Sequence, residues 1–389
     1  MKLYLNLVLL LVVPLNLSCG IDPDKVAGHA LLADDGDLLA SEEPVSFAVV
    51  GNTRPARPLV EGSSVQAGTD AQILADIAAQ AQLSGGPSFL VHLGDGVRMG
   101  LTSEWRRFQT QFSTVLQESD TESSSHLKAI PAMGNGERFL DRWYQGPGAA
   151  YPDFGADIGF NRVGSWFRFD VDVGRFRWRF VVLDSNKRAL GSRWGEQLHW
   201  IPGAVQGDYD KLVLFFHDPL FDLGGDDLSM NRDGAPLELV EAVEDATRVL
   251  KLVAVFAAGS ATSQVLVPDG PFGTLHVGAG ASGVLADDLR RWGSAEEAGR
   301  RQDVQLEPLF DVALQGALDQ WHSISPMPEP VLDEAKARGT FEGFTGVYSA
   351  KHFPVRGWWS VRLEDGRMAV SFRHLNGAGN LATIYTVSY

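Results

Sequence analysis

Two stretches decide the fold, residues 46–54 (SFAVVGNTR) and residues 88–96 (SFLVHLGDG). Each is a short apolar run that ends in glycine beside a polar residue, and runs of this kind are typical of strands buried on both faces of a sheet. Between them, residues 70–83 place Ile73, Leu74 and Ile77 on one helical face. The strand–helix–strand order predicts adjacent strands in an α/β domain.

The same pattern continues along the chain. Further buried strands are predicted at 126–135, 211–219, 251–260 and 272–283, and helices at 105–116, 196–205 and 237–250. Residues 166–186 are expected to form a hairpin that turns at Gly174, and residues 358–374 a second one that turns at Asp365 and Gly366. We therefore expect a layered α/β sandwich of two mixed β-sheets flanked by helices, over residues 45–389, with a polar helical insertion at about 285–345.

Composition excludes some partners. The 389-residue chain is 44% hydrophobic and has a formal net charge of −16. A chain of this length and composition can bury a large core, but an acidic surface repels polyanions, so no nucleic-acid partner is expected. Ten tryptophans are present, and we expect them to pack in the core and across hairpins rather than to bind sugar at the surface.

The N-terminal segment predicts export. Lys2 precedes an apolar run that ends at Ser18 and Cys19, too short to span a bilayer but suited to a signal peptide over residues 1–19. Cys19, the chain's single cysteine, resembles the lipidated residue of bacterial lipoprotein signals; the alternative is an ordinary cleaved signal. Residues 20–44 are acidic and are expected to be a linker. The predicted location is the bacterial cell envelope, periplasm or cell surface, with a membrane anchor at Cys19.

Polar turns follow five of the predicted strands, where open α/β sheets bind ligands. They are Gly51-Asn52-Thr53-Arg54, Gly94-Asp95-Gly96, Gly134-Asn135-Gly136-Glu137, His217-Asp218-Pro219 and Gly259-Ser260-Ala261-Thr262. Their order resembles the calcineurin-like metallophosphoesterases, which include purple acid phosphatases and carry the blocks D-x-H, G-D, G-N-H-E/D, H and G-H-x-H after successive strands. The resemblance covers about residues 45–285 and 355–375, and it implies that fold.

The resemblance also implies a degenerate site. By its pattern two metal ions would share the ligand positions, but Asn52 and Arg54 replace the first acid and histidine, Gly136 replaces the catalytic histidine, and Ser260 and Thr262 replace the last two histidines. Asp95, Asn135 and His217 keep the family's residue types, so five of eight positions are changed. A guanidinium cannot ligate metal, and its charge repels a cation nearby. We expect at most one divalent ion, Mn, Fe or Zn.

Several site residues have a second interpretation. Asp95 and Asn135 are metal ligands or helix caps, and His217 is a ligand or a hydrogen-bonded buried histidine. Arg54 binds an anion or pairs with Asp95. Glu137 is expected at the pocket rim, in solvent.

Three functions follow from these residues. The first is a pseudoenzyme that binds an anionic small molecule or a protein partner at or near the pocket where the resembling family binds its metal ions. The second is a residual phosphoesterase with one metal held by Asp95, Asn135 and His217. The third is a structural surface protein that uses its tryptophans and the 285–345 insertion. Whether the protein is an enzyme stays open at this point.

Overall fold

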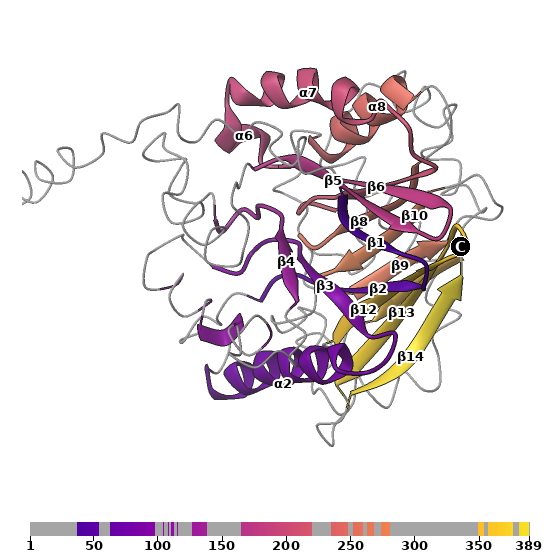
Figure 1. Ribbon diagram of the computed structural model, residues 1–389. Coiled ribbons are helices and arrows are strands. Elements are labelled where there is room, and N and C mark those ends of the chain that lie inside the picture. The colour runs from indigo at the N-terminus through magenta and orange to yellow at the C-terminus, as the bar shows by residue number, and fades with distance from the viewer. Residues whose placement is uncertain are drawn as a thin grey trace, which may run out of the picture.

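The fold is a four-layer arrangement of helix, sheet, sheet and helix (Figure 1). The computed structural model describes residues 37–53, 63–97, 104, 108, 110–112, 115, 127–137, 165–219, 235–247, 252–259, 263–267, 274–280, 349–353, 357–375 and 381–388. Cys19, the signal segment, residues 20–36 and the 285–345 insertion lie outside these residues.

The first sheet has eight strands in the order β1-β5-β6-β7-β8-β10-β9-β11. Their bounds are β1 Asp37–Ser41, β5 Phe167–Val173, β6 Phe176–Val182, β7 Lys211–Phe215, β8 Leu252–Ala257, β9 Ser263–Val267, β10 Leu275–Ala279 and β11 Ser349–Phe353. Strands β6, β7, β8 and β10 run parallel, whereas β5, β9 and β11 join by antiparallel pairing.

The second sheet has six strands in the order β14-β13-β12-β2-β3-β4. Their bounds are β2 Val45–Val50, β3 Pro87–His92, β4 Lys128–Pro131, β12 Gly357–Glu364, β13 Arg367–Leu375 and β14 Leu381–Ser388. Strands β2, β3 and β4 are parallel, and the C-terminal strands add in antiparallel fashion. Both sheets are therefore mixed, as the sequence predicts.

Phenylalanine rings fill the space between the two sheets. From the second sheet, Phe47 and Phe89 stack with ring centroids 4.8 Å apart. From the first, Phe180 stacks on Phe169 at 4.9 Å and on Phe215 at 5.6 Å. The two groups meet edge to face, since Phe47 lies 5.7 Å from Phe180. This geometry suits the ring quadrupoles and fixes how the sheets lie on each other.

Helices cover the outer faces of both sheets. On the first sheet, α6 (Lys187–Leu190), α7 (Arg193–Ala204) and α8 (Ala235–Thr247) enclose a second apolar cluster with β7 and β8. On the second sheet, α2 (Ser63–Ala81) packs Ile73, Leu74 and Ile77 against β2 and β3. In the described part of the chain, no helix is long and apolar enough to cross a membrane.

The predicted hairpins are confirmed, and so is the core packing of the four tryptophans within them. Gly174 and Gly366 occupy the two turns with positive φ. Trp166, Trp178, Trp358 and Trp359 are all buried. One boundary was wrong: β1 lies within the segment expected to be linker and pairs in parallel with β5. Its sequence, DLLAS, is too short and too close to acidic residues to stand out by periodicity.

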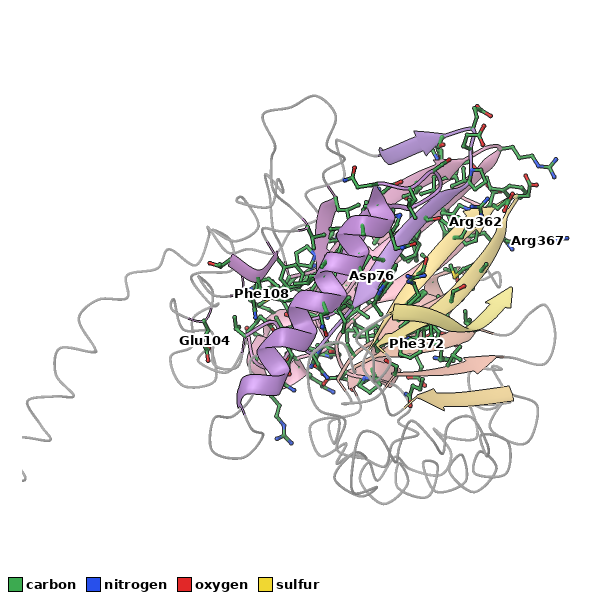
Figure 2. All side chains as sticks on the ribbon, turned by 90° about the horizontal axis from the view of Figure 1, so that it is seen from below. Asp76, Glu104, Phe108, Arg362, Arg367 and Phe372 are labelled. Atoms are coloured by element: carbon green, nitrogen blue, oxygen red, sulfur yellow. The ribbon has the colours of Figure 1, made fainter. Side chains whose placement is uncertain are left out.

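A polar contact ties α2 to the second sheet. The carboxylate of Asp76 accepts two hydrogen bonds from Arg373, both 3.0 Å long, and one of 2.8 Å from Trp358 Nε1. Figure 2 shows α2, which carries Asp76, lying across the sheet near the C-terminal strands. Because all three groups are largely shielded from water, this contact holds the helix more firmly than a surface ion pair would.

Replacing Asp76 with alanine should therefore destabilise the fold. We expect the free energy of unfolding in urea to fall by about 2–4 kcal/mol, because Arg373 and Trp358 keep their burial and lose their acceptor. The matched control is Glu364→Ala, which removes an exposed partner of Arg362 and should cost less than about 1 kcal/mol. Equal losses in the two variants would contradict this role for Asp76.

A buried histidine predicts sensitivity to acid. Burial on β10 lowers the pKa of His276 from 6.5 to about 3. Between these two pKa values the unfolded chain binds a proton at His276 and the folded chain does not. The contribution of neutral His276 to the free energy of unfolding is therefore complete above pH 6.5 and is lost as pH falls toward 3. Between pH 7 and pH 5 the wild type should lose about 2 kcal/mol more than His276→Gln in urea unfolding. An identical pH dependence of the two proteins would refute the assignment.

Candidate functional site

Loops from both sheets meet at the carboxyl ends of the parallel strands, and glycines let their backbones touch. A Cβ atom on Gly94, after β3, would lie 2.4 Å from the backbone nitrogen of Gly134, after β4. A Cβ on Gly51, after β2, would lie 2.2 Å from Cβ of Ala258, after β8. Side chains at these two positions would push the loops apart. Glycine is therefore required where the loops of the site approach one another.

Two polar residues in these loops have left-handed backbones. Asn52 has φ 51° and Asp95 has φ 59°, a conformation that side-chain-bearing residues rarely adopt. Hydrogen bonds hold both loops in place: Asn52 N donates to Gly94 O at 3.0 Å, and Leu93 N donates to Val50 O at 2.8 Å. Strained backbones of this kind concentrate at binding and catalytic sites.

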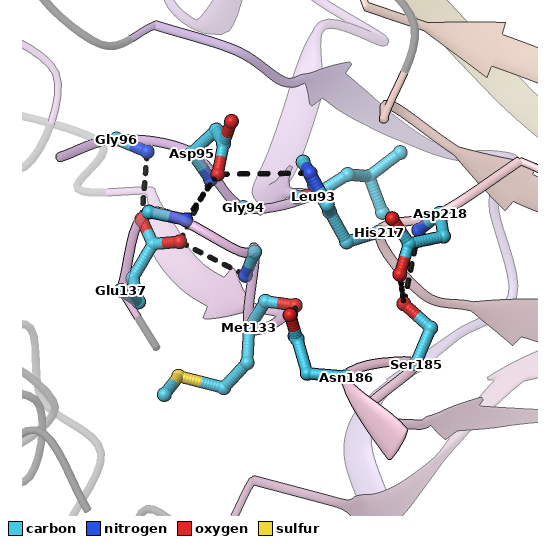
Figure 3. Close-up of polar contacts among 12 residues, drawn as sticks. Leu93, Gly94, Asp95, Gly96, Met133, Glu137, Ser185, Asn186, His217 and Asp218 are labelled. Atoms are coloured by element: carbon cyan, nitrogen blue, oxygen red, sulfur yellow. Dashed lines mark hydrogen bonds and ion pairs between the residues drawn. The ribbon is translucent and has the colours of Figure 1, made fainter. Parts of the chain in front are cut away.

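Asp95 lies at the centre of the site, 1% exposed (Figure 3). Its Oδ1 accepts a 2.7 Å hydrogen bond from Gly136 N and lies 3.6 Å from Nε2 of His217. The Oδ1 atom thus bonds across to the next loop. Asn135 lies half-buried in the turn that contains Gly136.

His217 is fixed by its other ring nitrogen. Its Nδ1 donates to the backbone oxygen of Leu93 at 2.7 Å, which leaves Nε2 directed toward Asp95. Among the described residues, this buried Nε2 has no hydrogen-bond partner. Burial acts to lower the pKa of His217, but the carboxylates of Asp95 and Asp218 outweigh it and raise the pKa. Without a metal, His217 therefore favours a proton and an ion pair with Asp95.

Glu137 is buried, which corrects the expectation that it lies in solvent at the rim. It is 3% exposed and its two oxygens accept four backbone hydrogen bonds. Oε2 accepts from Asp95 N and Gly134 N, both at 2.9 Å, and Oε1 accepts from Gly96 N at 2.7 Å and Val97 N at 3.3 Å. The acid at the fourth place of the G-N-x-E block was the available signal, because the family pattern carries an acid there.

The charge balance of the site changes accordingly. Burial and the Asp95 carboxylate raise the pKa of Glu137 to about 7, while the backbone hydrogen bonds act in the opposite direction. Glu137 is therefore a second buried acid beside Asp95, in addition to Asp218 near His217. Both Glu137 oxygens already accept backbone hydrogen bonds, so this acid adds no ligand atom that is free of other contacts.

Position 136, where the resemblance implies a catalytic histidine, has no room for a side chain. A Cβ atom on Gly136 would lie 2.0 Å from the backbone oxygen of Val97 and 3.1 Å from Asp95 Oδ1. The loop after β3 therefore occupies space that a side chain at position 136 would need.

A second polar network supports these loops from the first sheet. Asn186, after β6, donates from Nδ2 to the backbone oxygen of Met133 at 3.1 Å and to Asp184 Oδ1 at 2.9 Å. Ser185 donates from Oγ to Asp218 Oδ2 at 2.7 Å and accepts from Asp218 N at 3.0 Å. The sequence predicted residues 181–186 only as the end of a hairpin; their polar side chains join the loops after β4, β6 and β7.

His92 joins the loop that contains Asn52 to the loop that contains Asp95. Its Nδ1 accepts a hydrogen bond from Gly94 N at 3.2 Å, so its Nε2 carries the proton and faces Thr53 Oγ1 at 2.8 Å. Burial, with a smaller effect from His217, lowers its pKa to about 3. His92 therefore stays neutral and holds the Asn52 loop on the Asp95 loop.

The donor atoms present do not fit a pair of metal ions. Arg54, Ser260 and Thr262 lie outside the described residues, and by sequence none is a good ligand. Among the described residues, no group of three histidine, cysteine or acidic side chains is arranged so that it could hold a metal ion. Asp95 and His217, with the Asn135 amide on the adjacent turn, are a donor set for one ion at most.

The same architecture occurs in two solved structures. A purple acid phosphatase from yellow lupin (Lupinus luteus) seeds matches at 16% identity with a TM-score of 0.50, over 90% of this chain and 54% of that chain. PhoD matches at 11% identity with a TM-score of 0.50, over 90% of this chain and 70% of that chain. This chain thus spans just over half the length of the lupin structure's chain.

No protein-family model matches the sequence, and no curated protein does. At such low identity the likeness concerns the fold alone. Two mixed sheets flanked by helices, with the site at the carboxyl ends of their parallel strands, place the protein among structures with the metallophosphoesterase fold.

Proposed function

We propose that this protein is a catalytically degenerate metallophosphoesterase-fold protein that binds an anionic small molecule or a protein partner at the site around Asp95. The observation that carries the proposal is the closed position 136. Val97 O lies where a side chain would begin, so the site lacks both the catalytic histidine and the space for it. Asn52 in place of the first acid and Arg54 in place of the first histidine reduce metal affinity further.

The binding role rests on what the site retains. Asn52 and Asp95 both have left-handed backbones, and residues held in such conformations cluster at binding and catalytic sites. Arg54 would supply the positive charge for an anion from its place in the sequence, three residues after Gly51. As part of the same proposal, the protein is exported and anchored to a bacterial envelope membrane through Cys19.

A second candidate is a single-metal phosphoesterase. The observation that favours it is Nε2 of His217, which is buried without a hydrogen-bond partner among the described residues and lies 3.6 Å from Asp95 Oδ1. An Mn, Fe or Zn ion held by Asp95, Asn135 and His217 would act as a Lewis acid toward a phosphoryl oxygen. The metal would have to displace the proton from His217, so binding would weaken at low pH.

Metal and hydrolysis assays on the purified full-length protein separate the two candidates. We expect no more than trace hydrolysis of p-nitrophenyl phosphate and its bis ester with Mn²⁺, Fe²⁺ or Zn²⁺. We also expect any calorimetric heat of metal binding to disappear in His217→Ala. Rapid hydrolysis that is lost in His217→Ala would overturn the degenerate assignment in favour of the single-metal enzyme.

Restoring a histidine at position 136 should not restore chemistry. Gly136→His is expected to stay inactive, and Gly136→Ala should lower the free energy of unfolding by about 2 kcal/mol or more, because the Cβ collides with Val97 O. The control is Gly195→Ala on α7, where a Cβ meets nothing within 4 Å. That variant should be neutral or stabilised by up to about 1 kcal/mol. A stable Gly136→Ala would show that the position is open.

Anion binding is tested with inorganic phosphate. We expect the heat of phosphate binding to be lost in Arg54→Ala and kept in Arg362→Ala, which removes the same charge from an exposed pair with Glu364. Equal loss in both variants would indicate a nonspecific charge effect. Absence of phosphate binding in the wild type would exclude phosphate as the anion.

A further inference from the structure

The buried carboxylate of Glu137 occupies a position where the backbone amides of residues 95–97 could bind an anion. Backbone N–H groups of Asp95, Gly96 and Val97 point at one place, and Gly134 N joins them from the neighbouring loop. Successive amides that converge in this way form a nest, a recurring backbone site for phosphate and carboxylate groups. Here all four donate to Glu137.

The conformation of the loop explains why the nest exists. Gly94 has φ 88° and Asp95 has φ 59°, so two consecutive residues are left-handed before the chain continues through Gly96. These dihedrals turn the following amides toward the same side. Glu137 reaches the nest from the turn after β4 and is 3% exposed. Four buried amides without this acceptor would each carry a desolvation cost.

We propose that the amides of Asp95, Gly96, Val97 and Gly134 form an anion-binding nest whose resident ligand is the Glu137 carboxylate, and that the nest accepts a free small carboxylate when this side chain is shortened. Glu137 is then a positioning residue: through its four hydrogen bonds it holds the Asp95 loop in its left-handed conformation and links that loop to the Asn135 turn. The site is built in this way whether it binds a ligand or a metal.

Chemical rescue tests the proposal. The full-length protein, Glu137→Ala, Glu137→Gln and Glu137→Asp are heated in sodium formate and in sodium chloride of equal ionic strength at neutral pH. Formate should raise the Tm of Glu137→Ala with saturation and recover about half or more of the Tm lost. It should leave the wild type unchanged relative to chloride. Glu137→Asp should lose less than Glu137→Ala, because it keeps the charge.

Glu137→Gln separates charge from volume. Its amide group fills the same space but would point N–H groups at the N–H groups of the nest. We expect this variant to be destabilised and to gain nothing from formate. The control Glu364→Ala removes an exposed carboxylate and should show no effect specific to formate.

Hydrogen exchange locates the effect. In Glu137→Ala the amides of residues 95–97 and of Gly134 should exchange faster in chloride and slow down in formate. If Glu137→Ala folds only in formate, the yield of folded protein becomes the readout and supports the nest. Three outcomes would overturn the nest proposal. They are equal formate shifts in Tm for the wild type and Glu137→Ala, a Glu137→Gln variant as stable as the wild type, and a Glu137→Ala variant that is unfolded in both salts.

Discussion

The packing of phenylalanine rings between the two sheets is the interaction on which the rest depends. Phe47 and Phe89 from one sheet meet Phe180 of the other edge to face, and Trp359 adds a hydrogen bond of 2.8 Å from its Nε1 to Gly278 O across the same space. Aromatic contacts of this kind have preferred angles, so they set the registration of the sheets as well as their separation. The strand ends of both sheets therefore meet at one edge, where the glycine loops touch.

The site at that edge is held mainly by backbone groups. His217 donates to Leu93 O, Gly136 N donates to Asp95, and the Glu137 carboxylate accepts from two loops. A fold that fixes its loops through main-chain atoms tolerates replacement of the side chains that project from them. Such a fold can be shared at low sequence identity, as with the lupin structure at 16%.

The fold was predictable from sequence because its core strands are continuous apolar runs, such as those around Phe47 and Phe89. The edge strand β1 was missed, because edge strands carry little periodic signal. Within the site, Asp95 and His217 do come together, as the resemblance implied. Glu137 was misplaced because an acid beside an arginine in a glycine-rich turn normally faces solvent. Only the convergence of four amides from two loops, a tertiary feature, accounts for its burial.

The close approach of Val97 O to Gly136 limits how position 136 can change. A Cβ atom at position 136 would lie 2.0 Å from Val97 O, so any larger residue there would meet a folding defect first. Such a substitution would need the loop after β3 to move away. Position 136 can therefore change only together with that loop.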